Sequence, residues 1–195
     1  MNKNIVLCGV GGQGTVLASK LIAAAAMAKG IQVMSAETIG MAQRGGSVFS
    51  HIRMGEGLYS PMIAEKTADL IIGFEPGETV RMLPFLKEGG QVIVSSQPIM
   101  PVTATLADSG YSGEEMIEYL KAHVENLIVV DAREACRKLG SAKVLNILLL
   151  GKAAATGALG FSEEEIKEVI KEKVPEKFHE LNFQALQLAN LHSGI

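Results

Sequence analysis

The sequence contains no tryptophan and only two cysteines, and aromatic residues form 5% of its 195 residues. The cysteines are Cys8 and Cys136, and neither belongs to a CxxC pair. Two separate cysteines exclude a disulfide framework and supply no ligand set for an iron–sulfur cluster or a zinc ion. Cys8 lies in an apolar run, so we expect it to be a small residue of the core. We therefore predict no metal site in this chain.

Long hydrophobic segments and an excess of basic charge are also absent. The longest apolar runs, residues 21–28 and 144–150, are far shorter than the roughly 18 residues that cross a membrane. Glycines interrupt the first apolar segment where a signal peptide needs a continuous hydrophobic core. The net charge is −3, and the Lys and Arg residues are scattered, which argues against nucleic-acid binding. We therefore expect a cytoplasmic protein that binds neither membrane nor nucleic acid.

Apolar residues, by contrast, are abundant. They form 48% of the chain, and the mean hydropathy is +0.25. A chain of this length can bury a substantial core in one domain. The apolar excess indicates either a well-filled core or a surface that a partner covers, and composition leaves both open.

Hydrophobic patterning predicts strands that alternate with helices, followed by a helical part from about residue 143. The expected strands are 5–10, 31–36, 48–54, 70–74, 91–95 and 127–131. The expected helices are 15–29, 79–87, 113–123, 132–139, 143–156, one from Ser162 to before Pro175, and 176–191. The first strand, helix and strand form a β-α-β unit, which predicts parallel pairing of its strands. We therefore predict an α/β fold over residues 1–195, a single three-layer α/β/α domain with a mainly parallel, Rossmann-like sheet.

A glycine-rich turn, residues 9–14, separates the first expected strand from the first helix. It reads GVGGQG and fits G-x-G-x-x-G. Glycines permit positive φ and a close backbone approach, and a helix N-terminus offers N–H groups to a phosphate or carboxylate. Glu37 ends the second strand, where a ribose-binding acid would stand in a dinucleotide site. A tight turn that only packs helix against strand is the alternative, and no His or Lys has an obvious acid/base setting.

A second unusual segment, residues 41–53, reads MAQRGGSVFSHIR. Arg44 beside Gly45 and Gly46 places a fork of N–H donors next to exposed backbone amides, which suits an anionic group. The segment follows the second expected strand at the carboxyl edge of the sheet, where ligands bind in open α/β folds. Both glycine motifs should therefore face one crevice, although Arg44 could instead be a surface ion-pair partner. We expect His51 to be structural rather than catalytic.

These motifs, together with LYSPMI at residues 58–63, resemble the gamma-type domain of the 2-oxoacid:ferredoxin oxidoreductases. The second segment looks most like that of the small (beta) subunits of indolepyruvate:ferredoxin oxidoreductases, and the resemblance covers nearly the whole chain. It implies a non-catalytic subunit, inactive alone. The holoenzyme would oxidatively decarboxylate an arylpyruvate such as indolepyruvate to acyl-CoA and CO2, with electrons passing to ferredoxin.

The resemblance also implies where the cofactors lie. Thiamine diphosphate and iron–sulfur clusters are expected on a larger alpha subunit and none on this chain, with CoA as co-substrate of the complex. The gamma-type domain packs against the thiamine-binding domains and helps to form the substrate and CoA region. The residues that match this role are Gly9, Gly11, Gly12, Gln13, Gly14, Arg44, Gly45 and Gly46. A stand-alone dinucleotide-binding oxidoreductase and a non-enzymatic small-ligand module remain as alternatives.

Overall fold

The computed structural model describes residues 1–39, 45–100 and 110–191. Its centre is a six-stranded sheet with the order β2-β3-β1-β4-β5-β6. The strands are β1 (Lys3–Val10), β2 (Val33–Ile39), β3 (Ser47–Met54), β4 (Ala68–Gly73), β5 (Leu86–Ser95) and β6 (Asn126–Val130). Arg44, one of the predicted site residues, lies outside the described residues.

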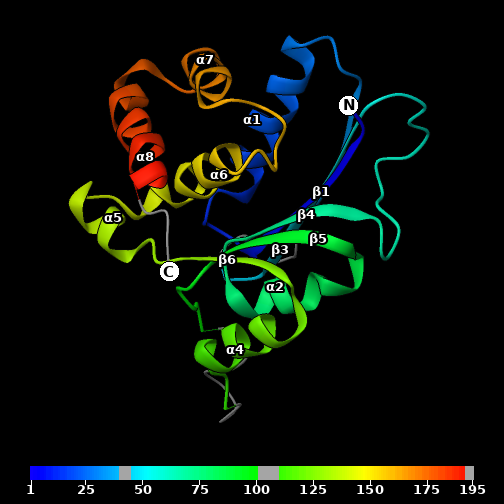
Figure 1. Cartoon of the computed structure of the whole chain (residues 1–195). Coiled ribbons are helices and arrows are strands. Elements are labelled where there is room, and N and C mark those ends of the chain that lie inside the picture. The colour runs from blue at the N-terminus through cyan, green and yellow to red at the C-terminus, as the bar shows by residue number, and fades with distance from the viewer. Residues whose placement is uncertain (40–44, 101–109, 192–195) are drawn as a thin grey trace.

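Helices cover both faces of the sheet (Figure 1). One face carries α1 (Thr15–Ala28), α6 (Leu145–Ala155), α7 (Glu163–Lys173) and α8 (His179–Leu191), and the other carries α2 (Pro76–Met82) and α4 (Gly113–His123). The short α5 (Arg133–Lys138) follows β6. Alternate residues of β1 enter the two cores, Leu7 below α1 and α6 and Val6 below α2 and α4. The predicted three-layer α/β/α architecture is therefore confirmed.

The strand directions confirm one part of the predicted topology and correct another. β1, β4, β5 and β6 pair in parallel, while β3 is antiparallel to both β1 and β2. Five of the six strands therefore point the same way, as a mainly parallel sheet requires. The predicted pairing of the first two strands is wrong, because β3 lies between them. A right-handed crossover fixes the direction of the returning strand but leaves room for another strand to pair beside β1.

The helix boundaries follow the capping signals more closely than the hydrophobic pattern. Ser162 and Glu165 form a reciprocal capping box at the start of α7, where the sequence predicts that this helix begins. The helix predicted at 79–87 instead begins at Pro76, which occupies the first helical position, where a proline fits well. It ends at Met82, and β5 begins at Leu86. None of the helices in the described part of the chain combines the length and apolar character needed to cross a bilayer.

Candidate functional site

The two glycine motifs meet at the carboxyl edge of β1. Because β3 runs antiparallel to β1, its first residue, Ser47, pairs with the last residue of β1, Val10. The Gly11 N–H donates to the Gly46 carbonyl at 2.8 Å, and the Gly45 N–H donates to the Gly11 carbonyl at 3.4 Å. The structure thus joins the glycine turn to residues 45–46 through their backbones.

Three of these glycines have backbone conformations that other residues rarely adopt. The φ angles of Gly12, Gly14 and Gly45 are 105°, 86° and 79°. A Cβ added at Gly14 would also lie 2.8 Å from Nδ2 of Asn146 on α6, whereas one at Gly12 would meet nothing within 4 Å. Gly14 therefore serves helix packing as well as the turn, and Gly12 leaves the outer side of the turn open.

Gln13 holds the turn from within. Its Oε1 accepts from the Val10 N–H at 2.7 Å, and its Nε2 donates to the Phe74 carbonyl at 2.8 Å. A Cβ added at Gly9 would lie 2.7 Å from both Gln13 Oε1 and Phe74 Cβ, so the glycine makes room for this arrangement. The Gln13 amide therefore ties the end of β1 to the residue that follows β4.

The N-terminus of α1 provides the donors at this edge. Gly14 is its N-cap and no side chain caps the helix, so the N–H groups of Thr15, Val16 and Leu17 have no partner within it. Such groups attract an anion. Furthermore, α1 follows β1 on one face of the sheet, and α2 follows β4 on the other (Figure 1). Ligands of open α/β sheets bind at switch points of this kind.

Two glutamates that the sequence analysis missed lie at the start of α2. Glu75 is 2% exposed and Glu78 is 8% exposed. Glu75 Oε2 accepts from the Glu78 N–H at 2.8 Å, while its Oε1 accepts from the Ile99 N–H at 3.4 Å and from the Tyr111 hydroxyl. Burial and the hydrogen bond to Glu75 raise the pKa of Tyr111, which favours the protonated phenol that donates to Glu75.

Glu78 links this acid pair to the second glycine motif. Its Oε2 accepts from Ser47 Oγ at 2.6 Å, and its Oε1 accepts from Arg81 Nη1 at 3.3 Å. The α2 side of the carboxyl edge is therefore acidic, and the α1 side offers backbone donors. The sequence signal for the pair was the run Glu-Pro-Gly-Glu directly after a buried strand, because a proline at the first helical position places Glu75 at the N-cap.

Glu37 does not reach the glycine turn, which corrects the dinucleotide interpretation. On β2 it pairs with Ser50 of β3, and Ser50 pairs with Leu7 of β1. One whole strand therefore separates Glu37 from β1. The row of paired residues that contains Glu37 also meets β1 at Leu7, before the strand ends at Val10. An acid in this position cannot hold the ribose of a dinucleotide whose pyrophosphate sits on the turn.

His51 and the two cysteines have structural settings. His51 is fully buried, and its Nδ1 accepts from the Ile63 N–H at 3.0 Å. Burial lowers the pKa of His51 and raises the pKa values of Cys8 and Cys136. Neutral thiols are poor metal ligands and poor nucleophiles. Among the described residues there is no group of three or more His, Cys, Asp or Glu side chains arranged to hold a metal ion.

Comparisons with known proteins agree with this architecture. Residues 4–190 match the family described as pyruvate ferredoxin/flavodoxin oxidoreductase. The indolepyruvate oxidoreductase subunit IorB of Archaeoglobus fulgidus is 39% identical over 189 residues, which cover 96% of this chain and 94% of that protein. The pyruvate/ketoisovalerate oxidoreductases common subunit gamma of Thermococcus kodakarensis is 29% identical over 184 residues, covering 93% and 91% of the two chains.

Two solved structures have the same fold. The gamma subunit of the keto/oxoacid ferredoxin oxidoreductase of Geobacter sulfurreducens is 25% identical with a TM-score of 0.67, over 97% of this chain and 96% of that one. The 2-oxoglutarate:ferredoxin oxidoreductase of Magnetococcus marinus is 19% identical with a TM-score of 0.72. That match covers 97% of this chain but 30% of the other, so the fold also occurs as part of a longer chain.

Proposed function

Because this chain belongs to the pyruvate ferredoxin/flavodoxin oxidoreductase family, we propose that it is the non-catalytic small subunit of an indolepyruvate:ferredoxin oxidoreductase. The observation that carries the proposal is the graded similarity, which is higher to the Archaeoglobus IorB subunit than to the Thermococcus common gamma subunit over nearly the same length. The complex oxidatively decarboxylates an arylpyruvate to acyl-CoA and CO2 and passes the electrons to ferredoxin.

The cofactors of this reaction belong to a larger partner in our proposal. The carbanion chemistry of decarboxylation is supplied by thiamine diphosphate, which we place on the larger alpha subunit with the iron–sulfur clusters. The only cysteines of this chain, Cys8 and Cys136, are both held as neutral thiols by burial, which supports placing the clusters elsewhere. The role left to this chain is to position a substrate.

The carboxyl edge of β1 is where we place that role. An anionic group of CoA or of the 2-oxoacid would bind the N–H groups of Gly12 and of the first turn of α1, with Arg44 as a cationic partner. Gly11, Gly45 and Gly46 bond to one another through their backbones and would shape the turn beside the anion. The α2 side carries the buried carboxylates of Glu75 and Glu78, and Arg81 balances Glu78 alone, so the net negative charge there favours anion binding on the α1 side. Gly9, Gln13 and Gly14 support the turn from behind, since their contacts are with the end of β4 and with α6.

We also propose that residues 1–195 form a single gamma-type domain. One apolar core contains residues of β1, α1, α6, α7 and α8, so the helical C-terminal part packs on the same sheet as the N-terminal unit. The location of the protein in the cytoplasm stays a prediction.

The test is purification from the source organism under anaerobic conditions, followed by native mass, visible absorbance and ferredoxin reduction with indolepyruvate and CoA. We expect the chain to co-purify with a larger, brown, thiamine-containing chain and the pair to reduce ferredoxin. The small chain alone is the control and should be inactive. A colourless free monomer or homodimer would contradict the proposal and would favour a separate small-ligand module.

A further inference from the structure

The loop between β3 and β4, residues 55–67, exposes two large apolar side chains. Tyr59 is 95% exposed, the highest fraction among the large hydrophobic residues of the described part of the chain, and Met62 is 51% exposed. We call this segment the amino-edge loop, because β3 ends and β4 begins at the edge of the sheet opposite the glycine turn. Two large apolar side chains exposed on one short segment are the kind of surface that a protein partner covers.

The amino-edge loop is held firmly although its side chains point outward. Arg53 Nη1 donates to the Ser60 carbonyl at 2.9 Å, and the Ile63 N–H donates to His51 Nδ1 at 3.0 Å. The Ile63 side chain is 3% exposed and belongs to the core below α2 and α4. One bond lies between Tyr59 and Met62 and the other directly follows Met62, so binding a partner there would cost little conformational entropy.

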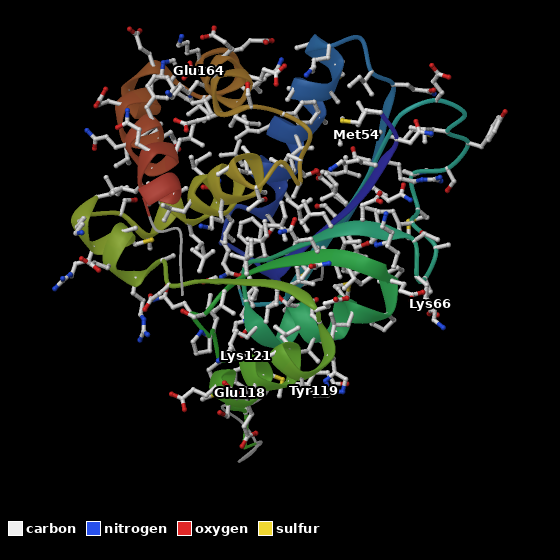
Figure 2. All side chains as sticks on the ribbon, in the orientation of Figure 1. Met54, Lys66, Glu118, Tyr119, Lys121 and Glu164 are labelled. Carbon is white, nitrogen blue, oxygen red and sulfur yellow. The ribbon has the colours of Figure 1, made fainter. Side chains whose placement is uncertain are left out.

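The surroundings of Tyr59 differ from those of the other exposed tyrosine. Residues 57–64 carry no charge. Tyr119 is 45% exposed and stacks on His123 of its own helix, with ring centroids 3.9 Å apart. It lies on α4 beside Glu118 and Lys121, which form an ion pair at 2.8 Å (Figure 2). Tyr119 therefore already has an intramolecular partner and a charged neighbourhood, whereas no ring contact engages Tyr59 among the described residues.

We propose that Tyr59 and Met62 form the docking surface of this chain for the larger subunit of its oxidoreductase, an inference that rests on the proposed function. The cores of permanent interfaces are enriched in tyrosine and methionine and depleted of charge, which matches residues 57–64. A transient redox partner is steered by complementary charges, whereas residues 57–64 carry none, and the nearby Arg53 is half-buried and bonded to Asn4 and Ser60. The larger subunit is thus the occupant whose chemistry fits.

The experiment measures association of the purified small chain with the purified, cofactor-loaded larger chain under anaerobic conditions. Tyr59→Ser should raise the dissociation constant by at least about tenfold, as loss of a central tyrosine anchor does. Adding Met62→Ser should raise it further. Tyr119→Ser is the matched control and should bind like the wild type. A benzophenone side chain placed at position 59 should cross-link to the larger chain, and one at position 119 should not.

Each outcome has a separate meaning. Wild-type binding together with unchanged binding of the Tyr59→Ser, Met62→Ser double variant would overturn the docking surface and leave the proposed function standing. An equal loss in Tyr119→Ser would also overturn it, because the effect would not belong to the loop. Failure of the wild type itself to bind the larger chain would overturn both proposals. Thermal melting of each free variant checks that folding is intact, and the cross-link tests the surface without removing a side chain that folding requires.

Discussion

The two edges of the sheet present different kinds of chemical group. At the carboxyl edge, the side chains of Gln13 and Glu75 are hydrogen-bonded within the chain, so backbone groups of the glycine turn are what remains to meet a ligand. At the amino edge the backbone is the part that is held, by groups such as His51, while Tyr59 and Met62 point outward. Among the described residues, the carboxyl edge therefore offers main-chain groups to a ligand, and the amino edge offers side chains.

This difference determines how each edge responds to substitution. A site made of backbone depends on φ and ψ at every position, so even a methyl group added inside it changes the conformation. By contrast, exposed side chains on a loop whose backbone is hydrogen-bonded to the core can be removed without loss of folding stability. Their removal weakens only the binding of a partner. We therefore expect changes in the glycine turn to lower the stability of the free chain, and changes at Tyr59 or Met62 to affect only the complex.

The largest expected effect is that of Gly14→Ala. It combines a φ of 86° with a Cβ 2.8 Å from Asn146 Nδ2, so strain and crowding together should cost about 3–4 kcal/mol of unfolding free energy. Gly12→Ala is the matched control, because its φ is also positive but its Cβ would lie in open space; the cost there should be about 1–2 kcal/mol. Urea denaturation of the free chain measures both, and equal costs would show that packing against α6 is unimportant.

The next effect is that of Gln13→Leu. The change removes the donor to the Phe74 carbonyl and the acceptor for the Val10 N–H, which should cost about 2–3 kcal/mol. Gln13→Glu keeps the acceptor but faces the Phe74 carbonyl with a carboxylate, so it should not rescue stability. Denaturation at neutral pH tests this. A Gln13→Glu variant as stable as the wild type would mean that the bond to Phe74 carries little energy.

Local signals in the sequence located most elements because they depend on neighbouring residues. The capping-box spacing of Ser112 and Glu115, followed by apolar residues at helical spacing, predicted the helix at Gly113–His123 with both ends correct. The contact between the two glycine motifs also followed from the sequence, because strand ends of an α/β sheet meet at one edge. Pattern and capping are thus sufficient where the partner groups are close along the chain.

Pairings between distant segments could not be predicted in this way. The insertion of β3 beside β1 depends on which of several strands competes best for the same edge, and a crossover fixes only direction. The hydrogen bond from Tyr111 to Glu75 joins residues 36 positions apart, and no periodicity in the sequence predicts it. The same holds for Gln13, whose motif suggests a ligand contact but whose amide is used by Val10 and Phe74.

A smaller effect is expected for Arg44→Ala, which tests the anion site in the assembled enzyme. Loss of one charge-assisted contact should raise the Michaelis constant for CoA or the 2-oxoacid roughly tenfold while the subunits stay assembled. This is the converse of Tyr59→Ser, which should reduce assembly without changing the Michaelis constant of the complex that still forms. Unchanged kinetics of Arg44→Ala in an intact complex would remove Arg44 from the site.

The smallest effects concern the pH dependence of stability, which is expected to differ between the two edges of the sheet. Burial lowers the pKa of His51 below its ordinary value of 6.5, so the folded state favours the neutral ring. The stability that this ring contributes is complete above pH 6.5 and is lost as the pH falls through the lowered value. Burial and the bond to Glu75 instead raise the pKa of Tyr111 above 10.0, so its contribution is complete below that pH and is lost at higher pH.

Acid should therefore loosen the amino-edge loop first, and alkali should loosen the start of α2 first. Hydrogen exchange of the Ile63 and Glu78 amides, followed from pH 5 to above pH 10 and corrected for the intrinsic rate, distinguishes the two openings. His51→Asn keeps an acceptor near the Ile63 N–H but does not titrate, so it should remove the acid response of the loop and leave the alkaline response intact. Tyr111→Phe should do the reverse. If both amides lose protection at the same pH in the wild type, the two edges open together. The distinction between a backbone site at one edge and an independently stabilised docking loop at the other would then be wrong.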